Sequence, residues 1–197
     1  MNSWEIKGHT LEYIDSTHTY LVDGVIVSSI TQILKSKFGN KYSGVDKDVL
    51  SKASEKGTKV HEAIEKYCKT GEVEDMKEVK NFIFLQKQYK FEVIDNEVPI
   101  ILFIGDKPVG AGRLDLVLKI EDELGLGDIK RTSVLDKEYL TYQLNLYRIG
   151  YQQCYDTEIK FLKGLHLRED TRKFIDIKIK EDMSMKLVDE YLKEKEK

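Results

Sequence analysis

The stretch RLDLVLKIEDELGLGDIK, residues 113–130, contains two runs of alternating aliphatic residues on either side of an acidic break. This alternation predicts two antiparallel strands with a turn at Glu121 and Asp122. Ile120 then faces Glu123, and counting outward places Asp115 opposite Asp128, with Cβ atoms about 5 Å apart. A turn shifted by one residue moves Asp115 toward Lys130 instead. Either register brings Asp115 to the same patch, because Asp128 and Lys130 share one face of their strand.

Two carboxylates this close repel each other unless a cation lies between them. Carboxylate oxygens from Asp115 and Asp128, with the backbone carbonyl of Ile129, suit Mg²⁺ or Mn²⁺. Such an ion supplies an attacking hydroxide and neutralises phosphate charge, and Lys130 stabilises the transition state or orients the water. An ordinary half-exposed strand also alternates charged and aliphatic residues. Opposed acids favour the metal, since like charges destabilise a plain hairpin.

The chain carries five short motifs in one order. They are Gly57-Thr58-Lys59-Val60-His61, Glu97-Val98-Pro99, Gly112-Arg113-Leu114-Asp115-Leu116-Val117, Gly127-Asp128-Ile129-Lys130 and Gln143-Leu144-Asn145-Leu146-Tyr147. In this order they resemble the RecB-like, phage-type exonuclease branch of the PD-(D/E)XK nuclease superfamily, over residues 57–147.

The resemblance implies a role for each matching residue. His61, Asp115 and Asp128 would ligate the metal, Lys130 would be the catalytic lysine, Gln143 and Tyr147 would lie beside the DNA, and Glu97 matches a less uniform acidic position. Several relatives hold an iron–sulfur cluster on four cysteines, whereas this chain has only Cys68 and Cys154. We therefore expect similarity to the members without a cluster.

Two predicted helices carry the remaining candidates. On a helix over residues 57–69, His61 borders the apolar face, and Glu65 one turn later could fix its tautomer. The alternative is a surface histidine paired with a glutamate. On a helix over residues 136–154, Gln143 and Tyr147 are stacked four residues apart, with the tyrosine at the border of the apolar stripe. A plain buried tyrosine is the alternative there.

The pattern predicts an α/β fold in which helices flank a central mixed sheet, and the resemblance implies that its core is restriction-endonuclease-like. We expect Leu114, Leu116, Leu118 and Ile129 on one face of the sheet, and Val117, Leu124 and Leu126 on the face that carries the metal. The remaining expected elements are an N-terminal hairpin over 13–27 with its turn at 23–24, a helix capped by Ser28 or Ser29, a loop over 38–46, helices over 46–55 and 75–90, strands over 91–131, 158–167 and 173–179, and a C-terminal helix.

The length of 197 residues suits a single domain. We divide it into an N-terminal extension (1–45), a nuclease core (46–180) and a C-terminal helix (181–197). No signal peptide or membrane span is recognisable, and two cysteines fit a reducing cytoplasm. The net charge of −3 is unusual for a DNA-binding protein. Residues 35–69 contain nine lysines and five acids, so they either line a DNA entrance or form a solvated helix.

These patterns predict a Mg²⁺- or Mn²⁺-dependent deoxyribonuclease. The resemblance implies an exonuclease that acts on DNA ends in phage recombination or DNA repair, with DNA as partner and a single-strand annealing or recombination protein as a second candidate partner. The alternative is a non-catalytic nucleic-acid-binding module of a recombination complex that retains the nuclease fold. The acidic net charge motivates this alternative, which predicts DNA binding that ignores divalent metal.

Overall fold

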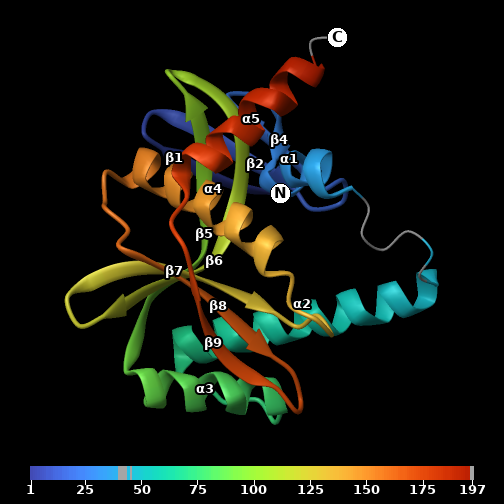
Figure 1. Ribbon diagram of the computed structural model, residues 1–197, viewed down its shortest axis with the longest axis vertical. Helices are drawn as coiled ribbons and strands as arrows, with labels where there is room; N and C mark the ends of the chain where they lie inside the picture. Colours follow the sequence, from blue (N-terminus) through green and yellow to red (C-terminus); the bar gives the residue numbers. More distant parts are fainter. Residues whose placement is uncertain (40–43, 45, 196–197) are drawn as a thin grey trace.

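The computed structural model describes residues 1–39, 44 and 46–195, and this part of the chain forms nine strands in one mixed sheet and five helices (Figure 1). The strands are β1 (Asn2–Ile6), β2 (His9–Ile14), β3 (Thr19–Val22), β4 (Val25–Ser29), β5 (Phe91–Ile104), β6 (Lys107–Ile120), β7 (Glu123–Lys130), β8 (Phe161–Leu167) and β9 (Arg172–Ile177). The helices are α1 (Ile30–Phe38), α2 (Lys47–Thr70), α3 (Lys77–Tyr89), α4 (Lys137–Tyr155) and α5 (Glu181–Lys195). The expected mixed α/β fold is confirmed. None of these helices is long and apolar enough to span a membrane.

Strand β6 is the centre of the sheet. One of its edges pairs with β5 along most of its length. Two strands share its other edge: β4 pairs in parallel with Gly110 and Ala111, and β7 pairs antiparallel with residues 116–120. Among the described residues, no strand pairs with residues 112–115 on that second edge. The sheet therefore has a gap in its ladder between β4 and β7.

The register of the β6–β7 hairpin confirms the turn at Glu121 and Asp122. Ile120 pairs with Glu123, and the ladder continues to Leu116 opposite Gly127. The alternative register, shifted by one residue, is thereby excluded. Continued by one step beyond the last pair, this register sets Asp115 level with Asp128, as the count from the turn predicts.

Helices cover both faces of the sheet. On one face, Leu116, Leu118 and Ile129 pack with α2 and α3. On the other face, Val117 and Leu126 belong to the larger core, to which α1, α4, α5 and the N-terminal strands contribute. The expected division of the faces was wrong for Leu114, which belongs to this larger core. In Figure 1, α2 and α3 lie together at the end of the molecule opposite α5 and the N-terminal strands.

Two local expectations were wrong. The N-terminal segment is a four-stranded meander and not one hairpin, because β1 adds a strand and a further turn separates β2 from β3; the turn at Asp23 and Gly24 is confirmed. Residues 47–70 form one helix, not two, since Gly57 continues it at a cost of about 1 kcal/mol. The helix cap is Ser29, whose hydroxyl accepts from the Gln32 N–H. Of the expected loop over 38–46, Phe38 ends α1, and 40–43 and 45 lie outside the described residues.

Candidate metal centre

The gap along β6 places Asp115 where a backbone partner is missing. Past the last ladder pair, the Ile129 N–H of β7 donates a hydrogen bond of 2.7 Å to Oδ2 of Asp115. The Asp115 carboxylate thus replaces the backbone carbonyl that a neighbouring strand would supply, and it satisfies the buried N–H of Ile129. Its second oxygen, Oδ1, is left facing His61.

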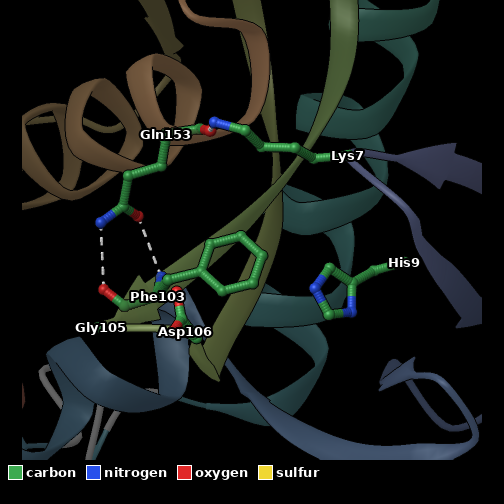
Figure 2. A pocket seen from close by; sticks show the side chains of 6 residues that line it. All are labelled: Lys7, His9, Phe103, Gly105, Asp106 and Gln153. Atoms are coloured by element: carbon green, nitrogen blue, oxygen red, sulfur yellow. Dashed lines mark hydrogen bonds between the residues drawn. The ribbon is translucent and has the colours of Figure 1, made fainter.

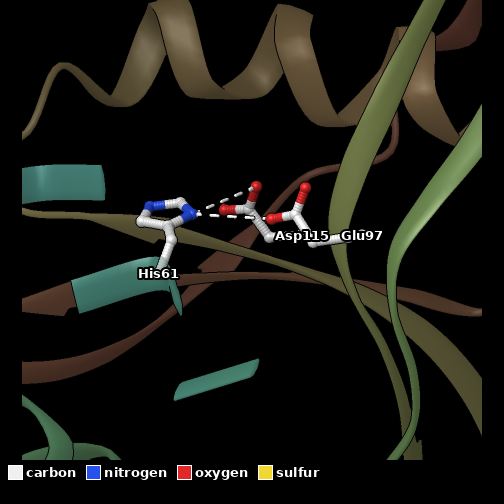
Figure 3. Close-up of side chains that lie close together, drawn as sticks. All are labelled: His61, Glu97 and Asp115. Atoms are coloured by element: carbon white, nitrogen blue, oxygen red, sulfur yellow. Dashed lines mark ion pairs between the residues drawn. The ribbon is translucent and has the colours of Figure 1, made fainter. Parts of the chain in front are cut away.

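Three side chains from three elements meet at this point (Figure 3). Nδ1 of His61, on α2, lies 3.7 Å from Oδ1 of Asp115 and 4.0 Å from Oε1 of Glu97, which is on β5. One ligand atom of each residue lies within 4.8 Å of the others, and the cavity among the side chains has a volume of about 10 Å³. A single water or ion needs about that much space. One imidazole and two carboxylates suit a divalent cation.

The second imidazole nitrogen fixes how His61 is presented. Its Nε2–H donates to the Ile129 carbonyl at 3.2 Å, so Nδ1 faces the two carboxylates. Burial lowers the pKa of His61, but the charge of Asp115 and the contact with Glu97 outweigh it and raise the pKa to about 9. Without an ion, the imidazolium therefore neutralises the carboxylates. A metal has to displace this proton in order to bind Nδ1.

Glu97 reaches the site through an unusual backbone conformation. Its φ of 53° is left-handed, although it stands inside a strand. The β5–β6 ladder pairs Asn96 with Leu116 and Val98 with Leu114, so Glu97 lies between two pairs and level with Asp115. Left-handed backbone costs a residue with a Cβ about 1–3 kcal/mol and tends to cluster at functional sites.

Asp128 and Lys130 form a buried ion pair beside this group. Oδ2 of Asp128 lies 2.5 Å from Nζ of Lys130, and the Asp128 side chain is 2% exposed. Burial raises the pKa of Asp128 to about 6, while Lys130 lowers it. Asp128 was expected among the metal ligands, but the structure brings together His61, Glu97 and Asp115.

Two accessory residues have partners other than those expected. Glu65 does not hold the imidazole, because its carboxylate pairs with Lys69 at 2.5 Å. The tautomer is set instead by the Ile129 carbonyl, which was expected to bind the metal and accepts from His61. The helical spacing of His61 and Glu65 was correct, but β7 passes closer to the imidazole.

Gln143 and Tyr147 are buried under the sheet and do not line an open surface. Their side chains are 6% and 7% exposed. The Tyr147 ring packs on Gly112, where an added Cβ would lie 2.8 Å from Cε1 of the ring. Burial raises the pKa of Tyr147 well above its usual range. This placement matches the alternative of a plain buried tyrosine, with Gly112 making room for it.

The lysine-rich segment is partly neutralised by its own surroundings. Lys56 pairs with Glu169, and Lys66 lies 2.8 Å from Glu72. These contacts connect α2 to neighbouring segments of the protein, so they favour a solvated helix over a free basic surface.

A larger cavity lies away from the candidate ligands His61, Glu97 and Asp115. Its volume is about 340 Å³, and it is lined by Lys7, His9, Phe103, Gly105, Asp106 and Gln153 (Figure 2). The amide of Gln153 bridges the backbone N–H and carbonyl of Phe103, at 2.9 and 3.1 Å. Phe103 is near the end of β5, six residues beyond Glu97 and so about 20 Å along the strand.

Comparisons with known proteins leave the family open. The sequence matches no protein-family model and no curated protein. Among solved structures, the chain is similar to SSO0001, with a TM-score of 0.43 and 14% sequence identity, over 84% of this chain and 74% of that one.

Proposed function

We propose that this protein is a Mg²⁺- or Mn²⁺-dependent deoxyribonuclease. The proposal is supported mainly by one observation, which is that His61, Glu97 and Asp115 converge on a cavity the size of one ion. The buried Asp128–Lys130 pair lies on the adjacent strand. An imidazole and carboxylates that can hold a divalent ion, with a half-buried lysine nearby, suit the metal-assisted hydrolysis of a phosphodiester.

The residues divide the chemistry among them. A divalent ion, when bound, lowers the pKa of water and neutralises charge on a phosphate. His61, Glu97 and Asp115 would hold this ion. Two of these ligands are fixed by hydrogen bonds to the backbone of Ile129: His61 donates to its carbonyl, and Asp115 accepts from its N–H. Lys130 stabilises the charge that develops on the phosphate oxygens. Asp128 keeps this ammonium group protonated and positioned.

We infer the finer properties from the resemblance of the motifs. They are an exonuclease activity at DNA ends, a role in phage recombination or DNA repair, and a recombination or annealing protein as partner. The cytoplasm is the compartment we propose, because both cysteines are free thiols.

The test is degradation of linear and circular duplex DNA by the purified protein with Mg²⁺ or Mn²⁺. We expect cleavage that EDTA abolishes, and a decrease of about a hundredfold or more in Asp115→Asn and in Lys130→Met. Asp122→Asn, at the exposed hairpin turn, is the matched control and should cleave like wild type. If wild type leaves both substrates intact, or if Lys130→Met cleaves at the wild-type rate, the proposal is refuted. DNA binding without metal and without cleavage would support the non-catalytic module.

A further inference from the structure

We propose that Arg113 is a phosphate-binding residue of the metal centre and contacts the DNA backbone beside the phosphate that is cleaved. This inference rests on the proposed nuclease function. It assigns a role to a residue to which the sequence motifs gave none.

The first support is the position of Arg113 in the sheet. It lies in the gap along β6, two residues from Asp115, and both side chains approach Glu97: Nε of Arg113 lies 3.5 Å from Oε2 of Glu97, and a carboxylate oxygen of Asp115 lies within 4.8 Å of one of Glu97. If the β6–β7 register is continued past Leu116 and Gly127, Asp115 is level with Asp128 and Arg113 is level with Lys130. Each strand therefore presents one acid and one cation, two residues apart. A phosphate lying across the gap would meet a cation on either side.

The contacts of Arg113 are the second support. Its Nε lies 3.5 Å from Oε2 of Glu97, while Oε1 of the same carboxylate faces His61. Its guanidinium carbon lies 5.2 Å from the centre of the Tyr13 ring, and its side chain is 31% exposed. Tyr13 thus supports the guanidinium from the N-terminal meander. Glu97 joins it to the metal group.

The chemistry of the side chain suits a phosphate. A guanidinium has five N–H donors in a planar fork, which matches two oxygens of a phosphate. Glu97 is the one carboxylate within 4.0 Å of Arg113 among residues 1–39, 44 and 46–195. The other oxygen of Glu97, Oε1, faces the small cavity among His61, Glu97 and Asp115. A phosphate bound to an ion in that cavity would therefore lie close to Arg113.

A purely structural role is the competing explanation. Arg113 could serve only to hold Glu97 in its left-handed conformation, in which case its loss would weaken metal binding. A phosphate-binding role instead predicts that metal affinity is kept, because Arg113 competes with the metal for Glu97. The two roles therefore differ in a measurement that does not depend on cleavage.

The experiment measures binding of a fluorescent 20-base-pair duplex in Ca²⁺ across a range of salt concentrations, and Mn²⁺ binding by calorimetry. For Arg113→Gln we expect DNA affinity to fall about tenfold or more. The slope of log affinity against log salt should decrease by about 0.9, as for one lost phosphate contact. Mn²⁺ affinity should stay equal or increase, and Arg113→Lys should recover part of the DNA affinity. The control is Arg172→Gln, which removes an arginine that stacks on Phe84 at 3.6 Å on the α3 side of edge strand β9.

The outcomes separate this inference from the function on which it rests. If wild type cleaves DNA but Arg113→Gln binds it with wild-type affinity and salt slope, the inference is lost and the nuclease remains. If Arg113→Gln loses Mn²⁺ and DNA together, Arg113 only holds Glu97, and the inference is also lost. A wild type that neither binds Mn²⁺ nor cleaves refutes the proposed function itself. An equal loss in Arg172→Gln would show a general effect of charge and refute a specific contact.

Discussion

Asp115 uses its two oxygens for different purposes. Oδ2 accepts from the Ile129 N–H and ties β6 to β7, while Oδ1 faces His61. The residue is therefore both a candidate ligand and a substitute for a missing ladder bond. Replacing it removes a hydrogen-bond acceptor as well as a charge, so Asp115→Asn, which keeps one oxygen, is a better test than Asp115→Ala.

Cys68 provides a prediction that is independent of the metal. Burial raises its pKa to about 11, although Asn96 lowers it. The thiolate is the reactive form, so alkylation by iodoacetamide in Cys154→Ser should be slow at pH 7.5 and rise about tenfold per pH unit toward pH 11. The same protein unfolded in urea should level off near pH 9. A folded protein that also levels off near pH 9 would contradict the raised pKa.

The sequence predicted the acids of the site better than their partners. Asp115 and Asp128 follow from strand alternation and a two-residue turn, which are local rules. Glu97 was only a weak candidate, because no local pattern encodes a left-handed residue inside a strand. Arg113 was missed, although its spacing of two from Asp115 was a usable signal. The proposed role draws on a contact that the sequence does not indicate, with Tyr13, one hundred residues away.

At the scale of elements, α2 contains a second testable feature. Gly57 lies inside the helix with nothing within 4 Å of an added Cβ, whereas Gly71 caps it with a φ of 76°. Gly57→Ala should raise the free energy of unfolding by up to about 1 kcal/mol. Gly71→Ala should lower it by about 1 kcal/mol, because alanine is strained there.

Urea denaturation of the two glycine variants checks this pair. Opposite shifts of the midpoint with an unchanged slope are expected. A Gly57→Ala variant that is less stable than wild type would show that α2 needs a break at this position, as the sequence suggested.

Most elements could be predicted from sequence, and the errors have physical causes. A helix break was expected at Gly57 because glycine has a low helix propensity, but a long helix tolerates one glycine in its interior. β1 was missed because its pattern of one buried residue in five is weak, and it is held by pairing with β2. β4 and β7 pair with the same edge of β6, and β4 is far from β6 in the sequence. Periodicity alone carries no information on such pairings.

At the scale of the whole molecule, the candidate metal ligands His61, Glu97 and Asp115 connect a helical layer to the sheet. His61 comes from a helix that packs on one face of the sheet, while Glu97 and Asp115 come from two of its strands. An ion that binds all three binds only the folded chain. At a concentration one hundred times its dissociation constant, it should stabilise the fold by about 2.7 kcal/mol.

Calorimetric unfolding with Mn²⁺ or with EDTA checks this coupling. The unfolding temperature of wild type should rise with Mn²⁺ concentration, and that of His61→Gln or Glu97→Gln should not. Asp106→Asn, which changes the remote cavity, should respond like wild type. An equal rise in all variants would place the ion elsewhere.

The one-piece helix α2 has a mechanical consequence for the imidazole. Its buried residues are Val60, Ala63 and Ile64, and no residue from Lys47 to Lys59 is buried. At 1.5 Å per residue, its first turn lies about 21 Å from His61, so a tilt of ten degrees about the buried anchor would move that end by about 4 Å. His61 lies among the buried residues about which the helix would tilt, so the same tilt displaces it least. A tilt of this kind would therefore move the exposed N-terminal part of α2 and leave His61 close to Asp115.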